Sequence, residues 1–308
     1  MFALILGLAL LVRAQTLPAN APSNASSDPV IAAAGDIACD PFGSLDRMLT
    51  NVLNWCRSAD TARLIEAHHV SAVLALGDEQ YQNATTDGFG HAYAQTWGAF
   101  KAITYPTPGN HEYYTPDAAG YFAYFGARAG AAARGYYSFD LGAWHVVSLN
   151  GNCDEVGGCS AGSPQERWLR VDLARHRSAC TLAYWHQPRF SSGGHQSDVA
   201  FIPFWNDLYA AGADVALAGH DHDYERFAPQ TPDGRADKSR GIREFVVGTG
   251  GKSHDLFSAT APNSEVRNWT TFGILFLTLH RGSYDWQFTP IPGESFTDSG
   301  SGRCHGRR

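Results

Sequence analysis

The amino-acid sequence predicts a layered α/β domain. Short apolar segments with strand character alternate along the chain with segments of helical spacing, which is the pattern of strands and helices packed in layers. The sequence has no internal repeat and no Pro/Gly/Ser linker long enough to divide it. Its 308 residues, of which 44% are hydrophobic and 17% charged, suffice for one well-packed core.

The first half of the chain is expected to begin with a buried strand at residues 29–34. A helix at 58–69 and a strand at 70–76 follow, and a helix at 91–102 precedes an extended segment at 103–108. Residues 136–141 and 143–149 have the pattern of a β-hairpin around Gly142. Ser163 is a favourable N-cap for a helix that opens with Pro164 and has Glu166 in its first turn.

The second half continues with a strand at 180–185, an amphipathic helix at 199–211 and a strand at 214–218. Three further strands are expected at 243–247, 273–279 and 284–288. Polar clusters begin where predicted strands stop, and they are Gly35-Asp36, Gly77-Asp78-Glu79-Gln80-Tyr81, Gly109-Asn110-His111-Glu112, His186 and Gly219-His220-Asp221-His222. Because loops at the carboxyl ends of strands converge on one rim of a sheet, we expect these clusters to meet there.

The side chains in these clusters are carboxylates, a phenol, a carboxamide and imidazoles. Hard oxygen donors mixed with imidazole suit iron, zinc or manganese. The donors suffice for two metal ions if one carboxylate bridges them, and two ions can clamp both oxygens of an in-line displacement at phosphorus. The sequence therefore predicts a metal centre suited to phosphate chemistry.

The ordered motifs GD, GDxxY, GNHE, H and GHxH resemble the calcineurin-like metallophosphoesterase superfamily. Within it they are similar to the purple acid phosphatase branch, over about residues 29–290. The wider superfamily has a histidine where this sequence has Ala38, and Tyr81 stands where the purple acid phosphatases have a tyrosinate ligand. The resemblance implies a four-layer α/β/β/α sandwich with two mixed sheets and a single catalytic domain over residues 28–292.

The resemblance also implies roles for individual residues. The first metal ion would be held by Asp36, Asp78, Tyr81 and His222, and the second by Asp78, Asn110, His186 and His220, with Asp78 bridging. A phenolate ligand favours Fe(III) at the first position, with zinc, manganese or iron at the second. His111 would donate to the phosphate, with Glu112 orienting it. His195, on a glycine-rich loop, is a candidate for protonating the leaving group on position alone, and a solvated loop residue fits it equally well.

The expected function is hydrolysis of phosphate monoesters by attack of a metal-bound hydroxide on phosphorus. A phosphodiesterase of the same fold and a non-catalytic metal- or phosphate-binding protein remain as alternatives, and a carbohydrate-binding surface protein is a third. Asp221, Asp223 and Glu225 are expected to be structural, since neighbouring strand positions point to opposite sides. The segment 248–253 resembles a phosphate-binding P-loop, but Val246 occupies the place of its first glycine, so a turn that lines the metal site is expected instead.

The termini and cysteines predict an exported protein. Residues 1–14 are expected to be a signal peptide around an apolar run too short to span a bilayer, although no Lys or Arg precedes that run. Residues 15–27 are expected to be a flexible lead-in and 293–308 a C-terminal tail.

Six cysteines without a CxxC pair favour disulfides over a thiolate metal site. Proximity suggests Cys39–Cys56 and Cys153–Cys159, which leaves Cys180–Cys304 to anchor the tail, among fifteen connectivities. The net charge of −7 and the absence of a basic run argue against nucleic acid as a stable partner. The expected partner is a small phosphorylated substrate, and the oligomeric state stays open.

Overall fold

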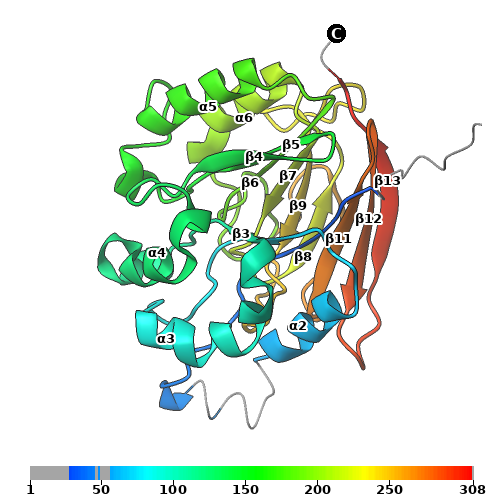
Figure 1. Ribbon diagram of the computed structural model, residues 1–308. Coiled ribbons are helices and arrows are strands. Elements are labelled where there is room, and N and C mark those ends of the chain that lie inside the picture. The colour runs from blue at the N-terminus through cyan, green and yellow to red at the C-terminus, as the bar shows by residue number, and fades with distance from the viewer. Residues whose placement is uncertain (1–27, 46–47, 49–55, 307–308) are drawn as a thin grey trace, which may run out of the picture.

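The computed structural model describes residues 28–45, 48 and 56–306. Two mixed β-sheets pack face to face, and helices lie outside them (Figure 1). The expected signal peptide at 1–14 and lead-in at 15–27 lie outside the described residues. No helix within the described residues is long and apolar enough to cross a membrane.

The first sheet has six strands in the order β13-β12-β11-β1-β2-β3. Their bounds are β1 Val30–Ala34, β2 Ala72–Ala75, β3 Thr104–Pro106, β11 Gly273–Leu279, β12 Ser283–Pro290 and β13 Asp298–Arg303. Strands β1, β2 and β3 are parallel, so their carboxyl ends share one edge. The other pairs are antiparallel.

The second sheet has seven strands in the order β10-β8-β9-β7-β6-β5-β4. Their bounds are β4 Tyr137–Leu141, β5 Trp144–Ser148, β6 Cys180–Tyr184, β7 Val215–Ala218, β8 Tyr224–Phe227, β9 Arg243–Val247 and β10 Ser264–Asn268. Strands β5, β6, β7 and β9 are parallel, and they place a second set of carboxyl ends at one edge.

Helices form the outer layers. The α-helices are α2 Ser58–Glu66, α3 Thr86–His91, α4 Ala119–Phe125, α5 Pro164–Arg175 and α6 Ile202–Ala211. Short 3₁₀ segments are η1 Tyr93–Gln95, η2 Trp97–Ile103, η3 Glu112–Tyr114, η4 Pro116–Ala118, η5 Gly126–Ala129, η6 Cys153–Val156 and η7 Val199–Phe201. Helices α5 and α6 pack together over the second sheet, while α2 packs on β11 of the first (Figure 1).

Alternating side chains of the second sheet divide the core into two parts. Leu182 and Tyr184 of β6 face the first sheet and join the large cluster between the sheets, which also contains Leu74 of β2. Ala183 of β6 points to the opposite face and packs with Trp205 of α6. Each central strand is thus covered on both faces, as expected where helices lie on both outer sides. The predicted four-layer fold is confirmed.

Two predictions of local structure require correction. The helix expected at 91–102 is replaced by η1 and η2, because the Thr96 hydroxyl hydrogen-bonds the carbonyls of Ala92 and Tyr93 and Gly98 weakens helix propensity. The segment 293–308, expected to be a tail, contains β13, which pairs with β12 along six positions. The boundary placed at residue 292 therefore leaves out an edge strand of the first sheet.

The three expected disulfides are all present. Cys39 pairs with Cys56, Cys153 with Cys159 and Cys180 with Cys304. The last one joins the start of β6, in the second sheet, to the residue after β13 in the first. It therefore links the two sheets covalently, in addition to anchoring the end of the chain.

Candidate metal centre

The predicted ligands come from the carboxyl ends of strands in both sheets. Asp36, Asp78 and Asn110 follow β1, β2 and β3 of the first sheet. His186 and His220 follow β6 and β7 of the second. The ligand-bearing loops of the two sheets meet, since the backbone N–H of His220 donates to Asp36 Oδ2 at 2.8 Å.

One half of the centre is built around the phenol of Tyr81. Its hydroxyl lies 2.8 Å from Asp36 Oδ1, 3.0 Å from Asp78 Oδ2 and 3.0 Å from His222 Nε2. Around a metal ion with bonds of about 2.1 Å at right angles, neighbouring ligand atoms lie about 3 Å apart. These four side chains therefore already have the spacing of adjacent ligands, and we refer to them as the Tyr81 half.

The other half is built around His186, which is completely buried. Its Nδ1 lies 2.8 Å from the carbonyl oxygen of Leu76, a contact that fixes the hydrogen on Nδ1 and turns Nε2 inward. Nε2 is 3.3 Å from Asp78 Oδ2 and 3.2 Å from His220 Nδ1. Asp78 Oδ2 thus faces both halves, which is the position that a bridging carboxylate requires.

Asn110 is the predicted amide ligand, and it lies in the chain between Gly109 and His111, whose backbones both approach Asp78. Its Oδ1 is buried and has no hydrogen-bond partner among the described residues. Its Nδ2 donates to the hydroxyl of Tyr114 at 3.3 Å. A buried carbonyl oxygen without a hydrogen bond is costly unless something else binds it, so this orphaned atom fits a metal ligand.

The backbone at the centre is strained and closely packed. Asp36, Asp78 and His220 have positive φ values of 61°, 49° and 73°, a region that residues other than glycine rarely occupy. Residues with such rare backbone conformations are frequent at functional sites. A Cβ on Gly109 would lie 2.1 Å from Asp78 Oδ1, and one on Gly77 would lie 2.5 Å from His186 Nδ1. These glycines are needed for space beside the ligands.

The buried acidic side chains of the centre favour a bound cation. Burial alone would raise the pKa of Asp78, but the adjacent His186 lowers it well below its usual value. Burial would lower the pKa of His186, and Asp78 raises it to about 10. Burial together with Asp36 and Asp78 raises the pKa of Tyr81 well above its ordinary value. Tyr81 would therefore lose its proton only to a cation placed among these oxygens, and the residues present fit a metal pair.

His111 lies over the same carboxylate. Its Nε2 is 3.7 Å from Asp78 Oδ2, its backbone N–H donates to Asp78 Oδ1 at 2.9 Å, and its ring is 4.2 Å from the Tyr81 ring. Its Nδ1 lies 2.7 Å from the carbonyl oxygen of Gln82, which leaves Nε2 toward the centre. His111 is thus placed where it could donate to a group bound there.

Glu112 does not orient the His111 ring by a direct contact. Its buried carboxylate accepts from the backbone N–H groups of Asp78 at 2.9 Å, Gly109 at 2.7 Å and Gln80 at 3.3 Å. Burial and the neighbouring Asp78 raise its pKa to about 7. Glu112 therefore joins the loops after β2 and β3 and fixes their spacing.

His195 also reaches the centre. Its ring lies 4.2 Å from the ring of His220, and its backbone N–H donates to Asp221 Oδ1 at 2.8 Å. Asp221 is buried and also accepts from Ser191, so it holds the loop in place, in agreement with its expected structural role. Glu225 has the same kind of role, because it accepts from the backbone and hydroxyl of Ser192.

Several neighbours were not predicted from the sequence. His222 Nδ1 lies 3.0 Å from Ser253 Oγ and 3.9 Å from Asp255 Oδ2, both on the loop after β9. The ammonium of Lys252, on the same loop, is 5.3 Å from the centre of the Tyr81 ring. The segment 248–253 therefore borders the centre, as expected for a turn that lines the metal site, although the individual contacts were not predicted. A glycine-rich turn directly after a predicted strand was the available signal.

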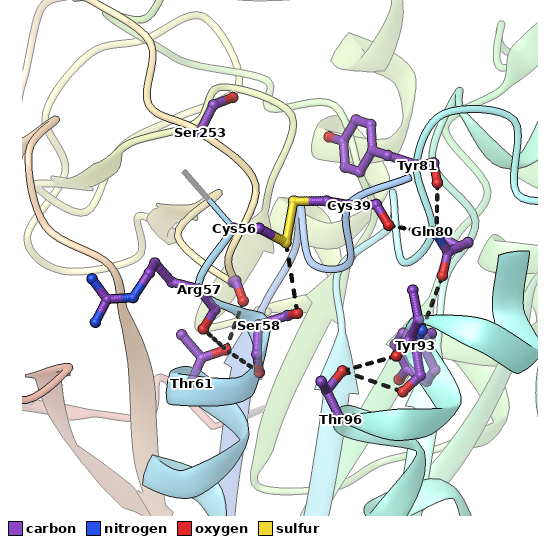
Figure 2. The surroundings of a disulfide bond; sticks show 12 residues. Cys39, Cys56, Arg57, Ser58, Thr61, Gln80, Tyr81, Tyr93, Thr96 and Ser253 are labelled. Carbon is purple, nitrogen blue, oxygen red and sulfur yellow. Dashed lines mark hydrogen bonds between the residues drawn. A yellow bond between two sulfur atoms is a disulfide. The ribbon is translucent and has the colours of Figure 1, made fainter. Parts of the chain in front are cut away.

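The Cys39–Cys56 disulfide joins two loops that support the Tyr81 half (Figure 2). On one side the carbonyl of Cys39 accepts from Gln80 Nε2 at 3.0 Å, and the same Nε2 donates to the carbonyl of Tyr81 at 2.6 Å. On the other side Cys56 forms a β-bridge with Lys252. The disulfide thus ties the loop of one ligand to the loop that contacts His222.

Two other groups of potential ligands lie elsewhere in the described residues. Asp140, His145 and His176 are close together, but both ring nitrogens of His145 contact carboxylates, Asp140 Oδ1 at 2.9 Å and Asp172 Oδ2 at 2.7 Å. Cys180, Asp214 and Cys304 also lie together, but the two sulfurs are joined in a disulfide. Neither group has the converging free donors of the centre described above.

The fold and the centre define a class: a two-sheet α/β sandwich with carboxylate, imidazole, amide and phenol side chains gathered where the carboxyl ends of strands from both sheets meet. Comparison with known proteins agrees with this class, because the model of the family described as calcineurin-like phosphoesterase matches residues 29–224. The chain belongs to this family. Its sequence is similar to purple acid phosphatase 18 of Arabidopsis thaliana, with 27% identity over 203 residues, 58% of this chain and 45% of the relative. The chain thus spans about half the length of that relative.

Solved structures show the same fold. The purple acid phosphatase PPD1 from yellow lupin matches with a TM-score of 0.67 and 20% identity, over 90% of this chain and 54% of the lupin chain. GAP50, described as the anchor in the inner membrane complex of Plasmodium, matches with a TM-score of 0.60 and 12% identity, over 92% of this chain and 90% of its own. At these identities the likeness establishes the architecture.

Proposed function

We propose that this protein hydrolyses phosphate esters at a centre of two metal ions. Phosphate monoesters are the leading substrates, and diesters are the alternative, because one metal pair can serve both. The observation that carries the proposal is the position of Asp78 Oδ2, within 3.3 Å of both the Tyr81 hydroxyl and His186 Nε2. A single carboxylate oxygen facing two sets of donors is the arrangement that a metal pair needs.

In this proposal Asp36, Asp78, Tyr81 and His222 hold one ion, and Asp78, Asn110, His186 and His220 hold the other. Bound metal ions would act as Lewis acids and make water more acidic, which is their usual part in phosphoryl transfer. Fe(III) is proposed at the Tyr81 half because a phenolate suits it, with zinc, manganese or iron at the second. The chain's own residues orient the ester, and His111 Nε2 donates to a phosphoryl oxygen as charge develops on it.

A non-catalytic role is the second candidate. The match to a protein described as an anchor supports keeping it, since one fold can host unrelated functions. The complete set of proposed metal ligands argues against a non-catalytic role. All seven proposed ligands and His111 are present, with three ligands held in strained backbone that a purely structural protein would have no reason to keep.

The test compares a chromogenic phosphate monoester with the matching diester, using metal-loaded protein and the variant Asp78→Asn. Wild type is expected to turn over at least one ester, and Asp78→Asn to lose activity and bound metal while staying folded. Asp140→Asn is the matched control, because it removes an exposed carboxylate that contacts a histidine in the second sheet, far from the centre in the fold. Metal-loaded wild type that hydrolyses neither ester would refute the proposal.

We also propose that the protein works outside the cytoplasm. Three disulfides, with no free cysteine among the described residues, support an oxidising compartment. Thiol titration of protein purified from its native source should find no reactive thiol. Six free thiols in active protein would contradict this assignment.

A further inference from the structure

Tyr114 lies at the edge of the metal centre. Its ring is 4.6 Å from the ring of His111, and its hydroxyl accepts from Asn110 Nδ2 at 3.3 Å. More than half of its surface, 56%, is exposed to solvent. An exposed aromatic ring is therefore held against the residue proposed to contact the phosphate and against one proposed to bind a metal ion.

The turn that carries Tyr114 is rigid. Residues 112–114 form η3, in which Glu112 is fully buried and bound to three backbone N–H groups. The next residue, Tyr113, accepts from Asn150 Nδ2 at 2.7 Å. Because the two preceding residues are anchored, Tyr114 presents an ordered ring to solvent beside the centre, and little conformational entropy of this side chain is lost when a group stacks on it.

The side chains around His111 are mostly neutral. Its ring nitrogens or ring face contact Gln82, Tyr81, Tyr114 and Asp78. Asp78 is the charged member, and it lies on the buried side, 2% exposed. The exposed side next to His111 therefore offers an amide and an aromatic face, which suit an uncharged, flat group.

We propose that Tyr114 determines specificity by stacking on the leaving group, and that the preferred substrates are aryl phosphates, whose ring is joined directly to the ester oxygen. This inference rests on the proposed hydrolysis of phosphate esters. The closeness of the two rings favours an aryl ester over a nucleotide, because a ribose would carry the base one ring further from the phosphate. Stacking on an aromatic side chain provides affinity for any flat π-system.

The experiment measures kcat/KM for phenyl phosphate, glycerol 2-phosphate and adenosine monophosphate. Tyr114→Ala is expected to lower the value for phenyl phosphate by about tenfold or more, from the usual strength of stacking, and to change the value for glycerol phosphate by less than about twofold. Tyr114→Phe loses the hydroxyl contact with Asn110 but keeps the ring, so it should keep the wild-type ratio of kcat/KM for phenyl phosphate to kcat/KM for glycerol 2-phosphate. Comparing each variant with wild type on the same substrate cancels differences in leaving-group acidity.

Three results would overturn the inference. One is an equal loss on phenyl and glycerol phosphates, which would make Tyr114 a support for Asn110. Another is Tyr114→Phe matching Tyr114→Ala. The third is a loss confined to adenosine monophosphate, which would assign the ring to a nucleobase.

A binding measurement separates this inference from the proposed function. Calorimetry with metal-loaded protein compares phenylphosphonate with methylphosphonate, neither of which can be hydrolysed. Wild type should bind the phenyl compound about tenfold more tightly, and Tyr114→Ala should lose that preference. If wild type hydrolyses no ester but keeps the preference, the catalytic proposal fails and the aryl site stands. If it hydrolyses esters without any preference, the reverse holds.

Discussion

Removing the Cys39–Cys56 disulfide, by changing both residues to serine, is expected to damage the Tyr81 half of the centre more than it damages the fold. The disulfide closes a loop with a sequence separation of 17. In the chain-entropy model, a loop of that length contributes about 3 kcal/mol to the free energy of unfolding. The other two disulfides, with separations of 6 and 124, correspond to about 2 and about 5 kcal/mol.

The site effect has a local cause. Without the disulfide, the contact of the Cys39 carbonyl with Gln80 and the β-bridge of Cys56 with Lys252 are no longer fastened to each other (Figure 2). The Tyr81 carbonyl depends on the same Gln80 amide, and Ser253, which contacts His222, follows Lys252 directly. The two ligands Tyr81 and His222 should therefore lose alignment together, while His186 keeps its contact with Leu76.

The assay titrates metal into metal-free protein and follows stability by urea unfolding under non-reducing conditions. The Cys39/Cys56 variant should lose one of two bound ions, or bind it at least about tenfold more weakly, at a stability cost of about 3 kcal/mol. The matched control is the Cys153/Cys159 variant, whose disulfide lies on another loop. The Cys180/Cys304 variant should be the least stable of the three and bind both ions normally. If metal affinity falls in proportion to stability across all three variants, the positional argument is refuted.

Three other changes have defined outcomes. Burial would lower the pKa of His145, but its contacts with Asp172 and Asp140 raise it above its ordinary value, so its contribution to stability is complete below about pH 6.5 and is lost as the pH rises through the folded pKa. His145→Gln should thus destabilise the fold more at pH 5.5 than at pH 9, and a pH-independent difference in urea unfolding would contradict this. Gly109→Ala forces Asp78 to move and should lower kcat/KM by about 100-fold or more in steady-state assays, whereas near-normal activity would show that the loops adjust freely. His195→Ala should lower kcat by about 10- to 100-fold for alkyl phosphates and less for phenyl phosphate, because phenolate leaves without a proton. An equal effect on both esters would exclude proton donation.

The sequence predicts most of the fold because the central strands are continuous apolar runs. The missed strand β13 shows where this signal ends. Its sequence, DSGSGR, has no apolar pattern, and its glycines are there because Trp286 and Tyr284 of β12 lie over them. A Cβ on Gly300 or Gly302 would come within 2.4 Å of those rings. The strand is specified by its partner, and no property of its own residues reveals it.

The candidate ligands were predictable for a different reason. Each candidate ligand lies in a short motif directly after a predicted strand, and the motifs occur along the chain in the order found in the family. The contacts of the supporting residues could not be predicted in this way, even where the residue itself, such as Glu112, was named. Glu112 binds the N–H of Asp78 across 34 positions in the chain, and the contact of Ser253 with His222 spans 31. Such contacts depend on which loops the fold brings together. The position of Tyr114 could not be predicted for the same reason, because only the structure shows that its ring lies against the ring of His111.

The position of the centre at the seam of the two sheets has a consequence for the whole molecule. Asp36 and Asp78 belong to the first sheet, while His186, His220 and His222 belong to the second. Contacts such as the 3.3 Å approach of His186 to Asp78 therefore cross from one sheet to the other. Ions held between them would stabilise the packing of the sheets by mass action, by about 2.7 kcal/mol at a free concentration one hundred times the dissociation constant. Metal binding and sheet packing would then be coupled, because neither sheet alone supplies all the proposed ligands of either ion.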